Sequence, residues 1–169
     1  LGAALFERFG RLDVLVGNAG LLGTLGPVAH GDPQVWEQVM AVNFTANWRL
    51  VRSMDPLLKM SEAGRAVFVT STVGASPRAY WGVYAVSKAA LETLVAIYAQ
   101  EVAKTAIRVN LLNPGATRTR MRAEAFPGED PMTLKTPDAL SEDFVRLADP
   151  ACDLNGELIT AGEPVPQAG

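Results

Sequence analysis

Short apolar segments alternate with long helical segments along this chain, and this alternation limits the fold more than any other feature. Strands are predicted over residues 13–17, 66–71, 107–112 and 157–161. Helices are predicted over residues 1–9, 32–59, 80–104 and, from weaker spacing, 139–147. Strands that alternate with helices imply a parallel sheet with right-handed crossovers. The predicted fold class is therefore α/β, a doubly wound parallel sheet between two helical layers.

Local signals place the first long helix and the loop before it. Asp32 is a typical N-cap, and Pro33 fits the first helical position that follows it. The turn-rich segment 21–31 is predicted to be a surface loop. Asn43 falls on the buried side of the helix, where an amide is unusual unless it orders a backbone carbonyl or a water molecule.

Composition excludes several classes of function. The 169 residues fit one domain, and a formal charge of -3 without a basic stripe argues against nucleic-acid binding. No targeting segment or membrane span is apparent, so we expect a cytoplasmic protein that does not enter a membrane. Cys152 is the only cysteine and His30 the only histidine, and neither has the spacing of a metal site.

Tyr84, Lys88 and Ser71 form the strongest chemical pattern in the sequence. Lys88 follows Tyr84 by four residues on one predicted helix, so the two side chains share a face. A lysine ammonium there is expected to lower the tyrosine pKa from its ordinary value of about 10. Tyr84 can then exchange a proton with a carbonyl or alcohol near neutral pH. Ser71, at the end of its strand, can donate a hydrogen bond to the same oxygen.

Three marked segments are expected to meet at one edge of the sheet. Asn18-Ala19-Gly20, Ser71 and Asn113-Pro114-Gly115 each follow a predicted strand. Ligands of doubly wound sheets bind at the carboxyl ends of the strands. Each segment alone is common as a structural turn or strand end, but together, in this order, they favour a hydride-transfer site.

This set of residues resembles the short-chain dehydrogenase/reductase family. The matching elements are Asn18-Ala19-Gly20, Val42-Asn43, Ser71, Tyr84-x-x-x-Lys88, and Pro114-Gly115 followed by Thr119. Segments 113–122 and 126–131 look more particularly like the YciK-type branch of that family. The resemblance implies a Rossmann-like fold and an NAD(P)-dependent oxidoreductase that moves a hydride between nicotinamide and a carbonyl or secondary alcohol.

Family likeness also implies a role for individual residues. The implied catalytic residues are Asn43, Ser71, Tyr84 and Lys88. The implied cofactor-binding residues are Asn18, Ala19, Gly20, Val42, Tyr84, Lys88, Pro114, Gly115, Thr117 and Thr119. The cofactor would be NAD or NADP, the substrate a small carbonyl or alcohol compound, and the long helices would pair two copies into a homodimer or part of a homotetramer.

The sequence departs from the family pattern before the strand at 13–17, where a Gly-rich pyrophosphate turn is expected and absent. We therefore interpret residues 1–169 as one partial, N-terminally truncated domain, in which preference for NAD or NADP cannot be read. The strand at 13–17 should form an apolar sheet edge. The alternative is a non-catalytic fragment or pseudoenzyme that serves as a dimerisation or interaction module.

Two further features have open interpretations. Arg118, Arg120 and Arg122 can attract an anionic ligand or simply be solvated. Met121, Phe126 and Met132 can belong to a mobile lid over the substrate or to a surface loop with an apolar underside.

Overall fold

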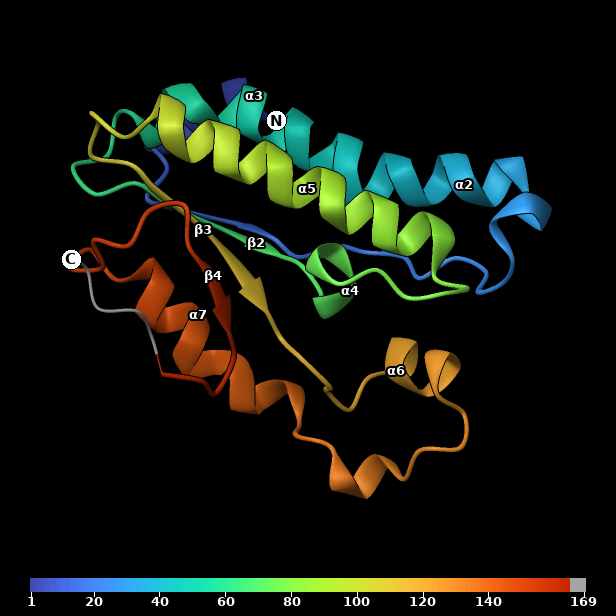
Figure 1. The fold of residues 1–169 in the computed structure, drawn as a ribbon. Helices are drawn as coiled ribbons and strands as arrows, with labels where there is room; N and C mark the ends of the chain where they lie inside the picture. Colours follow the sequence, from blue (N-terminus) through green and yellow to red (C-terminus); the bar gives the residue numbers. More distant parts are fainter. Residues whose placement is uncertain (165–169) are drawn as a thin grey trace.

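The computed structural model describes residues 1–164, in which strands and helices alternate along the chain (Figure 1). The strands are β1 (Val14–Gly17), β2 (Arg65–Val69), β3 (Arg108–Asn113) and β4 (Leu158–Thr160). The α-helices are α1 (Gly2–Phe9), α2 (Pro33–Met40), α3 (Ala46–Leu58), α4 (Thr72–Ala75), α5 (Gly82–Glu101), α6 (Arg120–Ala125) and α7 (Ser141–Ala148). Shorter turns are the 3₁₀ segments η1 (Val28–His30), η3 (Pro131–Thr133) and η4 (Pro137–Leu140), and the π-helical turn η2 (Ala41–Thr45).

The strands form one parallel sheet in the order β1-β2-β3-β4. Val16 of β1 pairs with Val67 of β2, which in turn pairs with Asn110 of β3. Because all strands run the same way, every connection crosses a face of the sheet, and all carboxyl ends lie on one edge. β1 is an edge strand with Val14 and Val16 exposed, as predicted for an apolar edge.

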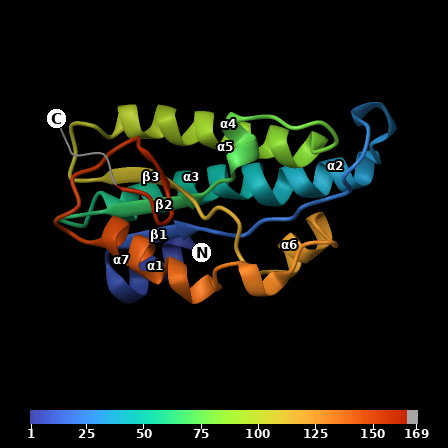
Figure 2. The same cartoon turned by 60° about the horizontal axis from the view of Figure 1, so that its bottom comes forward.

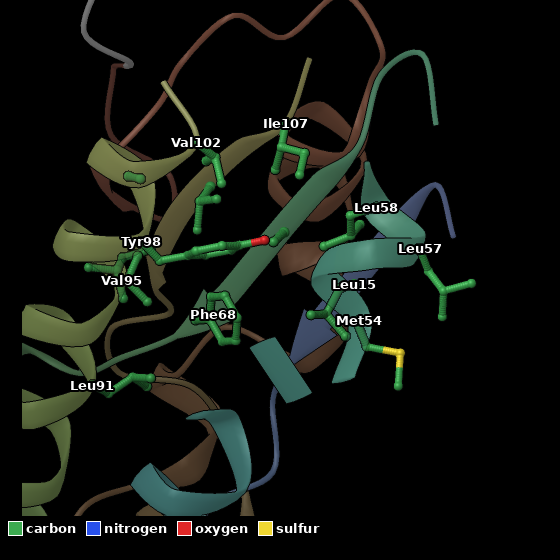
Figure 3. Close-up of a cluster of buried hydrophobic side chains, with 14 residues drawn as sticks. Leu15, Met54, Leu57, Leu58, Phe68, Leu91, Val95, Tyr98, Val102 and Ile107 are labelled. Carbon is green, nitrogen blue, oxygen red and sulfur yellow. The ribbon is translucent and has the colours of Figure 1, made fainter. Parts of the chain in front are cut away.

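Helices cover both faces of the sheet, so the predicted three-layer fold is confirmed (Figures 1 and 2). Successive side chains of β2 point to opposite layers. Phe68 belongs to the larger core cluster beneath α3 and α5, whereas Val67 packs with Leu147 of α7. Met54 of α3 and Leu91 of α5 belong to the same cluster as Phe68 (Figure 3).

The predicted long helix exists, but it contains a π turn that the sequence did not indicate. Asp32 caps its start, with Oδ1 accepting a hydrogen bond from the Gln34 amide at 2.7 Å. η2 joins α2 to α3 without a break in the helical backbone and widens the turn at Asn43. Single π turns within α-helices often occur at functional sites.

Several predicted boundaries were wrong. α5 begins at Gly82 rather than residue 80, because Tyr80 has a φ of 72°, in the left-handed region. α5 ends at Glu101 rather than at residue 104. β2 ends at Val69 rather than at residue 71, so Ser71 is the N-cap of α4 and not a strand residue. The segment 21–31 is not wholly on the surface, because Leu22 is buried beside the site.

α5 is also the one helix among residues 1–164 that is long and apolar enough to cross a membrane. Its 20 residues have a mean hydropathy of 1.2 in the most apolar window, and half of that window is buried within the fold. A core helix has the same composition because its apolar side chains face the sheet.

Candidate active site

The site lies at the carboxyl edge of the sheet, where the segments after β1, β2 and β3 lie side by side. These segments carry Asn18-Ala19-Gly20, Ser71 and Asn113-Pro114-Gly115. Asn113 Nδ2 donates to Thr72 Oγ1 at 3.0 Å, which joins the β3 segment to the start of α4. The predicted gathering of these segments at one edge is therefore observed.

Tyr84 and Lys88 project from α5 toward this edge and are both buried. Lys88 Nζ donates a hydrogen bond to the Val69 carbonyl at 2.7 Å, and it lies 5.8 Å from the centroid of the Tyr84 ring. Gly20 adjoins the same ammonium, since a Cβ on Gly20 would come within 3.7 Å of Nζ. The lysine thus connects α5, the end of β2 and the loop after β1.

Burial dominates the proton equilibria of both side chains. Burial lowers the pKa of Lys88 to about 8, although the nearby Glu92 carboxylate acts in the opposite direction. Burial raises the pKa of Tyr84 above its ordinary value, and the Ser71 side chain opposes that rise by hydrogen bonding. The expectation that the Tyr84 pKa is brought down toward neutrality is wrong here, because desolvation of the buried phenol has the larger effect and raises the pKa. Tyr84 is therefore a protonated phenol at neutral pH.

Asn43 holds the loop after β1 against η2. Its side-chain amide donates to the Leu21 carbonyl at 2.9 Å, and its Oδ1 accepts from the Leu21 amide at 2.8 Å. Asn43 is fully buried, whereas Leu21 is 42% exposed, so the two bonds tie a loop at the surface to the interior of the fold. Its predicted role in ordering a backbone carbonyl is confirmed, and the bonds keep Gly20 next to Lys88.

Ser87 lies within the candidate site, and the sequence interpretation missed it. Its hydroxyl accepts a hydrogen bond from Asn43 Nδ2 at 3.0 Å and donates to the Tyr84 carbonyl at 2.8 Å. Ser87 is fully buried and joins η2 to α5 directly beside Lys88. Its place between Tyr84 and Lys88 was the available signal, but a serine inside a helix usually bonds only to its own backbone.

The residues predicted to surround the nicotinamide lie in the segment after β3. Gly115 is exposed and has a φ of 63°, a conformation that suits glycine. Thr117 is buried, and its hydroxyl donates to the Pro114 carbonyl at 3.2 Å. Thr119 caps α6 by accepting from the Arg122 amide at 3.2 Å. Both hydroxyls therefore shape this segment, while half-buried Val42 lies apart from it in η2.

An apolar cluster adjoins Tyr84 near the start of α5. Trp81 lies with its ring centroid 5.9 Å from that of Tyr84 and 5.6 Å from that of Phe126. Met121 also packs against this cluster, whereas Met132 is exposed. The apolar underside predicted for this loop is therefore present.

The three arginines of this loop are already engaged with neighbouring side chains. Arg122 forms a two-pronged ion pair with Glu129, each bond 2.6 Å long, and stacks on Phe126. Arg120 pairs with Glu124, and Arg118 donates to Met132 Sδ. Neither predicted interpretation included this pairing within the loop, although the paired Arg120 side chain is also 92% exposed to solvent.

Within residues 1–164, no group of His, Cys, Asp and Glu side chains is arranged to hold a metal ion. Cys152 is half-buried and reduced, and His30 lies exposed in η1.

The doubly wound sheet, with its polar and titratable residues gathered at the carboxyl edge, is a Rossmann-like architecture. Residues 1–130 match the short chain dehydrogenase family. The chain therefore belongs to the short-chain dehydrogenase family, as the sequence motifs predicted.

Individual relatives agree with this assignment. The chain is 50% identical over 137 residues to the oxidoreductase YciK of Escherichia coli K12, a match covering 81% of this chain and 54% of YciK. It is 37% identical over 160 residues to an NAD-dependent oxidoreductase of Mycobacterium tuberculosis H37Rv, covering 84% of this chain and 58% of that protein. The predicted likeness to YciK is confirmed.

A solved structure gives the same result. A Shigella flexneri 2a protein, described as a short chain dehydrogenase complexed with NADP, matches with a TM-score of 0.91 and 42% identity. The match covers 96% of this chain and 68% of the Shigella chain. The chain spans a little over half the length of the two curated relatives.

Proposed function

We propose that this chain carries the catalytic part of an NAD(P)-dependent oxidoreductase that reduces a carbonyl compound to a secondary alcohol, and catalyses the reverse reaction. The observation that supports this most directly is the buried Tyr84–Lys88 pair, with Ser71 within hydrogen-bonding reach of the phenol. We propose Asn43, Ser71, Tyr84 and Lys88 as the catalytic residues.

The small residues at the sheet edge fit a nicotinamide cofactor. Asn18 and Ala19 are exposed, and Gly20 places backbone without a side chain next to Asn43 Oδ1 and the Lys88 ammonium, so that a ligand can approach this part of the loop closely. Asn18, Ala19, Gly20, Val42, Lys88, Pro114, Gly115, Thr117 and Thr119 are proposed to hold the cofactor. When bound, a reduced nicotinamide supplies the hydride. The relatives named above include both an NADP complex and an NAD-dependent enzyme, so both forms are candidates.

The protein side chains supply the proton and stabilise charge. During reduction the carbonyl carbon gains a hydride, its C=O double bond becomes a single bond, and the oxygen takes a proton from Tyr84 Oη. Ser71 donates a hydrogen bond to that oxygen as negative charge develops on it. Lys88 then stabilises the tyrosinate until it is reprotonated.

Cofactor titration tests the proposal without knowledge of the substrate. Nicotinamide fluorescence should report binding of NADPH or NADH to the purified protein. Lys88→Met should weaken that binding about tenfold or more, because a charge-assisted hydrogen bond is lost. The matched control is Lys59→Met on the exposed end of α3, which should bind as the unchanged protein does. Equal affinity of Lys88→Met and the unchanged protein would contradict the proposal.

The pH dependence of reduction should report Lys88. Its pKa of about 8 means that the ammonium is lost as pH rises through that value. The tyrosinate left by proton transfer then lacks its counter-charge, whereas Tyr84 itself stays protonated because its pKa is raised. We expect kcat/KM for ketone reduction to fall as pH rises through about 8. A profile that stays flat up to pH 9.5, where about 97% of Lys88 would be neutral, would exclude this role for the lysine.

We also propose that the protein is a homodimer or homotetramer in the cytoplasm. Large apolar side chains, Trp48 on α3 and Ile97 on α5, are 44% and 50% exposed on the helical layer. Ile97→Glu should halve the mass measured by light scattering, because a buried charge opposes association. Val145→Glu on α7, an equally drastic change on the other face, should leave the mass unchanged. A monomeric parent protein would refute the proposal.

A further inference from the structure

Glu92 lies one helical turn beyond Lys88 on α5 and contacts the segment that carries Ser71. Its Oε1 accepts a hydrogen bond from Thr70 Oγ1 at 2.5 Å. Thr70 is buried, and its backbone amide donates to the Leu112 carbonyl of β3 at 2.9 Å. Because Thr70 immediately precedes Ser71, the bond to Glu92 fixes the backbone from which the Ser71 hydroxyl projects.

Gly74 provides the space for this carboxylate. A Cβ at position 74 would lie 2.8 Å from Glu92 Cδ and would also overlap Oε1. Gly74 is in α4, which starts directly after Ser71, and its amide donates to the Ser71 carbonyl at 2.9 Å. The Glu92 carboxylate is therefore held between residues on both sides of Ser71.

The same carboxylate is the charge that acts on Lys88. Within residues 1–164, Glu92 is the one charged group that alters the Lys88 pKa, and it opposes the lowering caused by burial. The titratable neighbour on α5 is Tyr84, which is a neutral phenol at pH 7. The remaining neighbours are uncharged groups, namely the Val69 carbonyl from β2, Asn43 from η2 and Gly20 from the loop after β1.

We propose that Glu92 is a positioning residue that, through Thr70 and Gly74, fixes Ser71 beside Tyr84 and, from one helical turn away, stabilises the Lys88 ammonium. The triplet Tyr84, Lys88 and Glu92, spaced by four residues, thus acts as one unit along a single face of α5. The effect on Ser71 rests on the proposed oxidoreductase function, whereas the effect on Lys88 does not.

The first test measures the protonation of Lys88 without any substrate. In protein labelled with 13C at lysine Cε, Lys88 is identified as the signal that titrates near pH 8 and is missing in Lys88→Met. Glu92→Gln can still accept the hydrogen bond from Thr70 but removes the charge. We expect a decrease in proton affinity of about tenfold, which reduces the protonated fraction at pH 7.5 from about three quarters to about one quarter.

Matched variants distinguish the effect of the Glu92 charge on Lys88 from the effect of a general disturbance of α5. Glu101→Gln makes the same change at an exposed position of α5 and should leave the Lys88 titration unchanged. Gly74→Ala should displace the carboxylate and shift the titration in the same direction as Glu92→Gln. If Glu92→Gln titrates like Glu101→Gln, the electrostatic half of the proposal is overturned.

The second test uses kcat and KM to measure whether Glu92 positions Ser71 through Thr70. Thr70→Val keeps the charge of Glu92 but removes the hydrogen bond. We expect kcat for ketone reduction to fall about tenfold or more with little change in KM, because the Ser71 hydroxyl is misplaced in the transition state. Thr70→Ser keeps a hydroxyl and should restore kcat to within about twofold. Equal kcat for Thr70→Val and the unchanged protein would overturn the positioning role.

If the unchanged protein shows no turnover, the proposed function fails, and the Lys88 titration still decides the electrostatic half.

Discussion

Replacing Tyr84 by Phe is expected to reduce turnover by a factor of about 10² to 10⁴ while the fold and cofactor affinity persist. The change removes one oxygen atom, the proton donor for the carbonyl oxygen. The ring stays in place, so its contacts with Trp81 and the surrounding apolar cluster are retained. Initial rates of ketone reduction at pH 7 measure the loss, and nicotinamide fluorescence and circular dichroism measure what is kept.

Tyr80→Phe is the matched control for this experiment. Tyr80 lies just before α5 and is 63% exposed, so Tyr80→Phe removes the same phenol oxygen outside the site. Turnover of Tyr84→Phe within about threefold of Tyr80→Phe would rule out Tyr84 as the proton donor. Cofactor binding without turnover in the unchanged protein, over a panel of aliphatic and aromatic ketones, would instead support a non-catalytic interaction module.

Replacing Arg65 by Leu is expected to lower the free energy of unfolding by about 3 kcal/mol or more, because buried carbonyls lose their hydrogen-bond donors. Arg65 is 5% exposed at the start of β2 and has no carboxylate partner within residues 1–164. Its guanidinium instead donates to four backbone carbonyls, those of Gly64, Ala106, Asp149 and Pro150. Urea unfolding followed by circular dichroism measures the loss.

Two variants define what Arg65 contributes. Arg65→Lys keeps the charge but cannot reach carbonyls on separate loops with one ammonium, so we expect an intermediate loss. Arg49→Leu, at an exposed position on α3, should change the free energy of unfolding by less than about 0.5 kcal/mol. A similarly small effect for Arg65→Leu would mean that water replaces the guanidinium and that the network is not structural.

The sheet and the location of the site could be predicted because their signals are local. Residues close in the sequence determine the strand segments, the Asp32 cap and the Tyr84–Lys88 spacing. Parallel strands place their carboxyl ends at one edge of the sheet regardless of the side chains that they carry. The family resemblance implied roles for individual residues, and those roles are tested by Tyr84→Phe and Lys88→Met rather than by the fold.

The features that escaped prediction depend on contacts between distant segments. The direction of the Tyr84 pKa shift follows from burial of the phenol by several elements, which outweighs the hydrogen bond from Ser71. The hydrogen bond from Asn43 to Ser87 joins residues 44 positions apart, and that from Thr70 to Glu92 joins residues 22 apart. No periodicity or capping rule reports such pairs, because neither partner is unusual in its own segment.

Different side chains bind the two ends of β2, and this separates the stability of the fold from proton transfer, two properties that often conflict in enzymes. At its start, the Arg65 guanidinium donates hydrogen bonds to loop carbonyls. At its carboxyl end, Lys88 donates to the carbonyl of Val69, the last residue of the strand, and Glu92 accepts a hydrogen bond from Thr70, the next residue. Thermal robustness can therefore be selected at one end without disturbing proton transfer at the other.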